Sequence, residues 1–132
     1  MKRIFETQDS YIINDDSSIF FEAKEGIEID FSLEIDLLIK ALDSFGTEPF
    51  VYISNQCHHS SVLLYDYAYL EMLPNLIGMA IVIHKECNPM KMNLDKSLFK
   101  NPLRLFDSLA DAKRWSKKML KKNLRNKLKV VP

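Results

Sequence analysis

The stretch that decides the fold is IEIDFSLEIDLLIKALDSFGTEPFVYISN, residues 27–55. Asp30 is a typical helix N-cap, and Gly46 suits a C-terminal cap, so we predict a helix over Phe31–Phe45. Its apolar residues recur at helical spacing: Ile35, Leu38, Ile39 and Leu42. The run Phe50–Ser54 that follows is almost continuously apolar, which is typical of a strand buried on both faces of a parallel sheet.

Outward from this stretch, strands and helices alternate. Short apolar runs around residues 2–8, 11–14 and 18–24, separated by polar turn clusters, predict antiparallel pairing at the start of the chain. Further elements are expected after residue 55: strands over 78–84 and 103–106, and helices over 63–73, over 89–99 and from Leu109, where Ser108 and Asp111 resemble a capping box. The order β-β-α-β-α-β-α-β-α predicts an α/β domain with a mostly parallel sheet and an antiparallel N-terminal strand.

Length and composition are those of one globular domain. The chain has 132 residues, 47% hydrophobic and 27% charged, and we predict a single domain over residues 1–132. No apolar run reaches the roughly 18 residues that a membrane-spanning helix needs. The two cysteines suggest free thiols in a reducing compartment, so we expect a cytoplasmic protein.

Charge is unevenly distributed along a chain whose net charge is zero. Residues 1–50 hold four Lys/Arg and twelve Asp/Glu, whereas residues 113–132 hold nine Lys/Arg and no acidic residue. The basic end is interpreted as a solvated helix face that partly complements the acidic start. Alternatively, residues 121–132 form a basic extension that binds an acidic partner, anionic lipid or nucleic acid, or packs on a second copy through Leu124 and Leu128.

Two segments carry a resemblance to a known family. Residues 27–55, with a helix ending in Phe45-Gly46 and a strand reading Tyr-Ile-Ser-Asn, resemble bacterial STAS-like proteins of the SpoIIAA type, the anti-sigma-factor antagonists. Residues 103–118, LRLFDSLADAKRWSKK, look like the ending of the same domains. The resemblance implies a SpoIIAA-like fold.

In that family, a regulatory serine follows the strand that corresponds to Phe50–Ser54. The resemblance implies that Ser60 or Ser61 would be the phosphorylated residue here, although the family's preceding Asp and following Gly are missing. A helix N-terminus tolerates a phosphate because its backbone N–H groups are free. The alternative is that one of these serines simply caps the next helix.

Other chemistry at this edge of the sheet is weighed and not favoured. Cys57, His58 and His59 would lie near a second group after the next strand, namely His84, Glu86 and Cys87. These are zinc-ligand types, but no CxxC or HxxxH spacing is present. Pairing of Cys57 with His84, or of Ser60 with His58, for nucleophilic catalysis is not required by any spacing. Glycine-rich phosphate loops are absent.

We therefore predict a non-enzymatic regulatory or protein-interaction module without cofactor or metal. Its contact surface is predicted at the carboxyl edge of the sheet, in these residues: Asn55, Cys57, His58, His59, Ser60, Ser61 and Tyr65. The alternative is a small-molecule or lipid binder with an apolar cavity near Tyr52, Tyr65 and Tyr69. The expected partner is a protein, with a homodimer as an option. No specific nucleic-acid binding is expected, and membrane contact through the basic end is the less favoured alternative.

Overall fold

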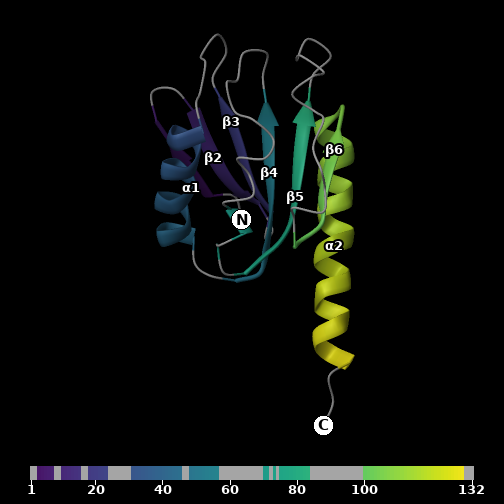
Figure 1. The fold of residues 1–132 in the computed structure, drawn as a ribbon. Coiled ribbons are helices and arrows are strands. Elements are labelled where there is room, and N and C mark those ends of the chain that lie inside the picture. The colour runs from purple at the N-terminus through teal and green to yellow at the C-terminus, as the bar shows by residue number, and fades with distance from the viewer. Residues whose placement is uncertain are drawn as a thin grey trace.

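In the part of the chain that it describes, the computed structural model has one six-stranded sheet and two helices (Figure 1). It describes residues 3–7, 10–15, 18–23, 31–45, 48–56, 70–71, 73, 75–83 and 100–129. The elements are β1 (Arg3–Glu6), β2 (Ser10–Asp15), β3 (Ser18–Ala23), α1 (Phe31–Phe45), β4 (Phe50–Gln56), β5 (Leu76–Ile83), β6 (Leu103–Phe106) and α2 (Leu109–Lys129).

The sheet follows the chain, with the order β1-β2-β3-β4-β5-β6. The pairs β1–β2 and β2–β3 are antiparallel, and β3–β4, β4–β5 and β5–β6 are parallel. The expected mixed sheet with antiparallel pairing at its start is confirmed. The expectation of two strands before the first helix is wrong, because three are present.

Hydrogen bonds between Thr7 and Ser10 connect the first two strands. The backbone N–H of Thr7 donates to the carbonyl of Ser10 at 2.8 Å, and the Thr7 hydroxyl also contacts the Ser10 backbone. Glu6 is paired with Tyr11 across β1–β2, so the apolar runs before Thr7 and after Ser10 are separate antiparallel strands. The sequence pattern identified both apolar runs, over residues 2–8 and 11–14, but it did not show that each forms its own strand.

The two helices cover opposite faces of the sheet. On one face, Leu37, Leu38 and Ala41 of α1 pack against inward-facing strand residues, which include Ile12, Ile19, Phe21, Tyr52, Met79 and Ile81. On the other face, Ala112, Trp115 and Met119 of α2 pack against residues that include Phe20, Val51, Ile53, Ala80 and Val82. Strands β3, β4 and β5 contribute alternate residues to both faces, as the buried central strands of an α/β sheet must.

The segments with the strongest local signals have the predicted bounds. Helix α1 spans Phe31–Phe45, and β6 spans Leu103–Phe106, as the sequence predicts. Strand β4 continues two residues beyond Ser54, and β5 begins two residues before Gly78.

The two remaining predicted helices are largely outside the described residues. All of the helix expected over 89–99 lies outside the described residues. Of the helix expected over 63–73, residues 70, 71 and 73 are described, and there Leu73 N–H donates to the Leu70 carbonyl at 2.9 Å. Both helices stay predictions.

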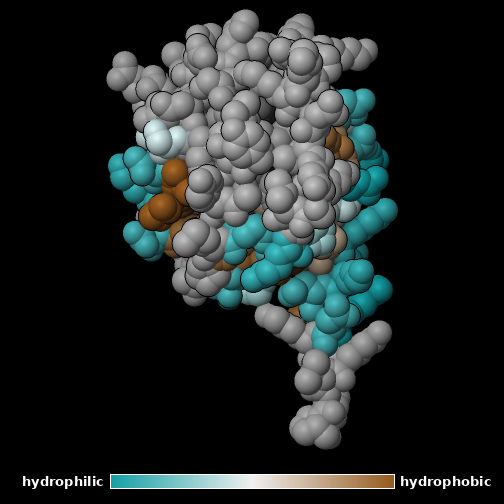
Figure 2. Space-filling model, viewed as in Figure 1, coloured by the Kyte–Doolittle hydropathy of each residue, from teal (hydrophilic) through white to brown (hydrophobic). Residues whose placement is uncertain are grey.

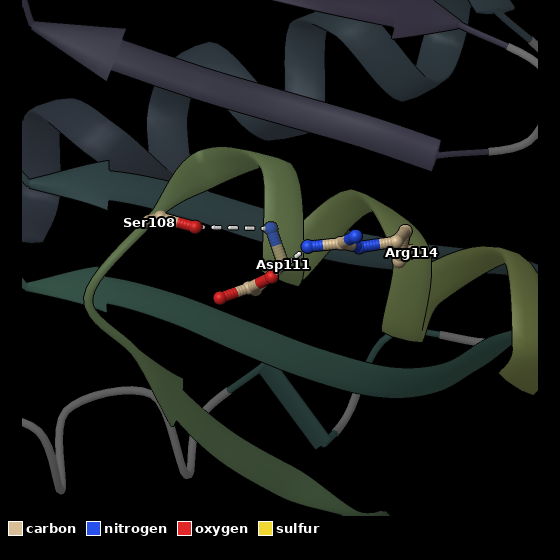
Figure 3. Close-up of polar contacts among 3 residues, drawn as sticks. All are labelled: Ser108, Asp111 and Arg114. Carbon is tan, nitrogen blue, oxygen red and sulfur yellow. Dashed lines mark hydrogen bonds and ion pairs between the residues drawn. The ribbon is translucent and has the colours of Figure 1, made fainter.

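Helix α2 begins with the cap that the sequence predicts. The backbone N–H of Asp111 donates to the Ser108 hydroxyl oxygen at 3.1 Å, and Arg114 donates to the Asp111 carboxylate (Figure 3). The hydrogen bond from Arg114, and then the contact with Ser108, lower the pKa of Asp111 below its ordinary value. Stabilisation from the ionised Asp111 is therefore present above the ordinary pKa and is lost as the pH falls through the lowered value.

Replacing Ser108 by alanine should lower the free energy of unfolding by about 1 kcal/mol, within a range of roughly 0.5–2, because an N-terminal N–H of α2 loses its acceptor. Urea denaturation of the wild type and the variant measures this difference. Exposed Ala110, replaced by serine, is the control, and it should change stability by less than about 0.5 kcal/mol. Equal stability of S108A and the wild type would show that the cap contributes nothing.

Candidate functional site: the carboxyl end of strand β4

Most of the predicted site residues lie outside the described part of the chain. These are Cys57, His58, His59, Ser60, Ser61 and Tyr65, together with His84, Glu86 and Cys87 of the metal alternative. Phosphorylation of Ser60 or Ser61 and clustering of the Cys and His residues therefore stay predictions. Among the residues that the structure describes, no group of three or more His, Cys, Asp or Glu could hold a metal ion.

Asn55 is the predicted site residue that the structure describes. Its side chain is 6% exposed, and its Nδ2 donates to Glu22 Oε1 at 3.1 Å. The Tyr11 hydroxyl donates to the other oxygen of the same carboxylate. The three side chains are neighbours because of the strand register: Tyr11 is opposite Glu22 across β2–β3, and Glu22 is opposite Asn55 across β3–β4. Asn55 is therefore a buried residue that links the carboxyl end of β4 to β3.

A second carboxylate lies on the other face of β4. Glu34, in the first turn of α1, is 2% exposed. Its Oε1 accepts hydrogen bonds from the Tyr52 hydroxyl at 2.5 Å and from the Ser54 hydroxyl at 2.8 Å. Tyr52 and Ser54 are two residues apart on a strand, so both point toward α1.

Together these contacts hold the end of β4 from both sides. Ser54 is tied to α1 on one face, and the next residue, Asn55, is tied to β3 on the other. Because β3 and β4 are parallel and α1 follows β3, the N-terminus of α1 lies at the carboxyl edge of these strands. The other predicted contact residues, from Cys57 to Tyr65, follow the end of β4 in the sequence.

The hydrogen bonds of Glu34 with Tyr52 and Ser54 position α1 on β4. Tyr52 and Ser54 are both 0% exposed, and each hydroxyl donates to the carboxylate. A buried carboxylate is stable only when it is hydrogen-bonded, and the hydroxyls provide this. The arrangement fixes the start of α1 against β4 and leaves these hydroxyls inaccessible to solvent.

Tyr52 was weighed as a core residue or as a wall of an apolar cavity. Its complete burial, its place in the core cluster and its hydrogen bond to Glu34 make it a core residue. Tyr65 and Tyr69, the other proposed cavity residues, lie outside the described residues.

Sequence reasoning missed Glu34, although a signal was present. Glu34 precedes Leu37, Leu38 and Ala41 by three, four and seven residues, so it occupies the buried stripe of α1. A charged residue at a buried position of an amphipathic pattern requires a polar partner. The polar residues Tyr52 and Ser54 inside an apolar strand are the matching signal.

The other notable surface is the basic side of α2. The side chains of Lys117, Lys118, Lys121, Lys122 and Arg125 are all exposed. In the same helix, Leu124 is 58% exposed. None of the helices in the described ranges is both long and apolar enough to span a bilayer.

Comparison with known proteins gives a match among solved structures. No family model matches the sequence, and no curated protein matches it. The chain is similar to the crystal structure of an uncharacterised protein of the DUF3478 family from Shewanella loihica, with 15% sequence identity and a TM-score of 0.47 over 88% of this chain and 92% of that one. The fold of that protein is SpoIIAA-like.

Proposed function

We propose that the chain is a non-enzymatic regulatory module that binds another protein through the carboxyl edge of its sheet, at residues 57–65. The observation that supports the proposal is the double attachment of β4. Glu34 holds Ser54 on one face, and Glu22 holds Asn55 on the other. Binding segments are commonly loops positioned by a rigid scaffold, and ligands of open α/β sheets bind at the carboxyl ends of strands.

The physical value of this attachment is preorganisation. Ordering a flexible segment on binding costs conformational entropy, so a fixed departure point lowers the cost of binding. Hydrogen bonds between side chains hold that point without requiring a ligand. The residues that would contact the partner are Cys57, His58, His59, Ser60, Ser61 and Tyr65, with Asn55 as their support.

Photocrosslinking in the protein's own cells tests the proposal. A photoreactive phenylalanine derivative at Ser61 should yield a covalent adduct with a distinct second protein. The same derivative at exposed Ala110 of α2 should not yield that adduct. The N55A variant removes the hydrogen bond to Glu22. It should reduce the adduct yield, because the end of β4 then loses its attachment to β3 on one face of the sheet.

Three outcomes would contradict the proposal. They are no adduct from Ser61, the same adducts from Ser61 and Ala110, or an adduct only with a second copy of the chain. Circular dichroism of each variant establishes that the fold is retained. Intact-mass measurement of the protein purified from its own cells then shows whether the chain carries a phosphate, and peptide mapping shows whether it is on Ser60 or Ser61.

A further inference from the structure

The outer end of α2 is an exposed helix with a mixed basic and apolar face. Helix α2 has 21 residues, so it is about 30 Å long, and Figure 1 shows that it continues past the end of the sheet. Lys117, Lys121 and Leu124 lie at i, i+4 and i+7, which places them on one side of the helix. All three are exposed.

The outer side of α1 has the complementary pattern. Ile39 is 45% exposed, and it is bordered at i−4 and i+3 by Ile35 and Leu42, which are half-buried and also pack against the core between α1 and the sheet. Figure 2 shows brown atoms over α1 with teal atoms beside them. The neighbouring exposed charges are Asp36, Asp43 and Lys40, with a net negative sum.

These two surfaces cannot meet within one chain. The inner side of α1 packs on one face of the sheet, and that of α2 packs on the opposite face. The basic surface and the acidic surface therefore point away from each other across the sheet. A contact between them requires two molecules.

We propose that the outer end of α2 docks on α1 of a second copy of the chain. Leu124 would pack against Ile39, and Lys117 and Lys121 would face Asp36 and Asp43. Each copy offers one α2 and receives one α2, so the contact is heterologous, and it closes as a ring or continues as a chain. The outer side of α1 offers both an exposed apolar residue for Leu124 and carboxylates for Lys117 and Lys121, which favours a second copy over nucleic acid, whose phosphate backbone provides no apolar surface.

Charge reversal on each side tests the pairing. The K117E/K121E variant has two acidic surfaces, and the D36K/D43K variant has two basic ones. We expect the wild type to self-associate in sedimentation experiments as its concentration rises, and less so at high salt. Each variant alone should associate about tenfold more weakly. An equimolar mixture should associate again, because every contact in a mixed assembly is complementary.

A matched control uses the same helix. The K118E/K122E variant has the same change in net charge on the side of α2 away from Leu124, and it should associate like the wild type. A wild type that stays monomeric at all concentrations would overturn the proposal, as would a mixture of variants that stays dissociated. Binding to anionic vesicles or nucleic acid in place of self-association, lost in K117E/K121E alone, would identify a polyanion as the partner instead. The Ser61 crosslink is independent of these residues.

Discussion

The E34A variant should have a free energy of unfolding lower than that of the wild type by about 2–4 kcal/mol. The reason is that the Tyr52 and Ser54 hydroxyls, both 0% exposed, would lose the carboxylate oxygen to which they donate. A buried hydroxyl without its acceptor costs more than the hydrogen bond itself contributes. Since small domains are stable by about 5–15 kcal/mol, the loss is a large fraction of the total. Equilibrium unfolding in urea, followed by circular dichroism, measures it.

Two further variants separate this explanation from the general effect of losing a side chain. E34Q retains a carbonyl acceptor and should lose less stability than E34A. E48A removes an exposed glutamate and should stay within about 0.5 kcal/mol of the wild type. In a double-mutant cycle of E34A with Y52F, the two losses should not add, because both remove the same contact. Additive losses, or an E34A variant as stable as the wild type, would refute the assignment.

The second large effect is expected at Leu38. This side chain is 0% exposed and belongs to the cluster that joins α1 to the sheet. L38A should lower the free energy of unfolding by about 2–5 kcal/mol, because it removes buried methyl groups and leaves a space that the neighbours fill only partly. Guanidinium denaturation of the purified variant measures the loss.

The neighbouring residue Ile39 provides the matched control for L38A. It lies on the same helix but is 45% exposed, so I39A should lose much less stability than L38A. The two variants also separate stability from assembly, because I39A should weaken self-association while the monomer stays folded. Equal losses of stability in L38A and I39A would contradict the assignment of the two sides of α1.

Local sequence was sufficient where local interactions decide the structure. Helix Phe31–Phe45 has a cap, an apolar repeat and a terminating glycine, and its bounds agree with the prediction. The cap at Ser108 also involves residues three apart in the sequence, and it forms as predicted. Strands β4 and β5 were found, but their ends shifted by one or two residues, because their length depends on pairing with neighbours.

Among the predicted site residues the structure describes Asn55, so the site at the carboxyl edge of β4 stays a prediction. Asn55 was included as a contact residue, yet it is buried against Glu22, a residue 33 positions earlier. Glu34 was passed over, because its partners, Tyr52 and Ser54, are 18 and 20 residues away. The hydrophobic pattern of one helix or strand carries no information about such a contact between two elements.

By itself, the sequence determined the helix Phe31–Phe45, the cap of α2 at Ser108 and the mixed sheet with antiparallel pairing at its start, because hydrophobic spacing and caps act over a few residues. Only the tertiary structure decided that three strands precede α1, that two carboxylates hold the end of β4 from opposite faces, and that an acidic α1 and a basic α2 point away from each other. These features depend on strand register and on which face each helix covers, and both are set when distant segments pack together.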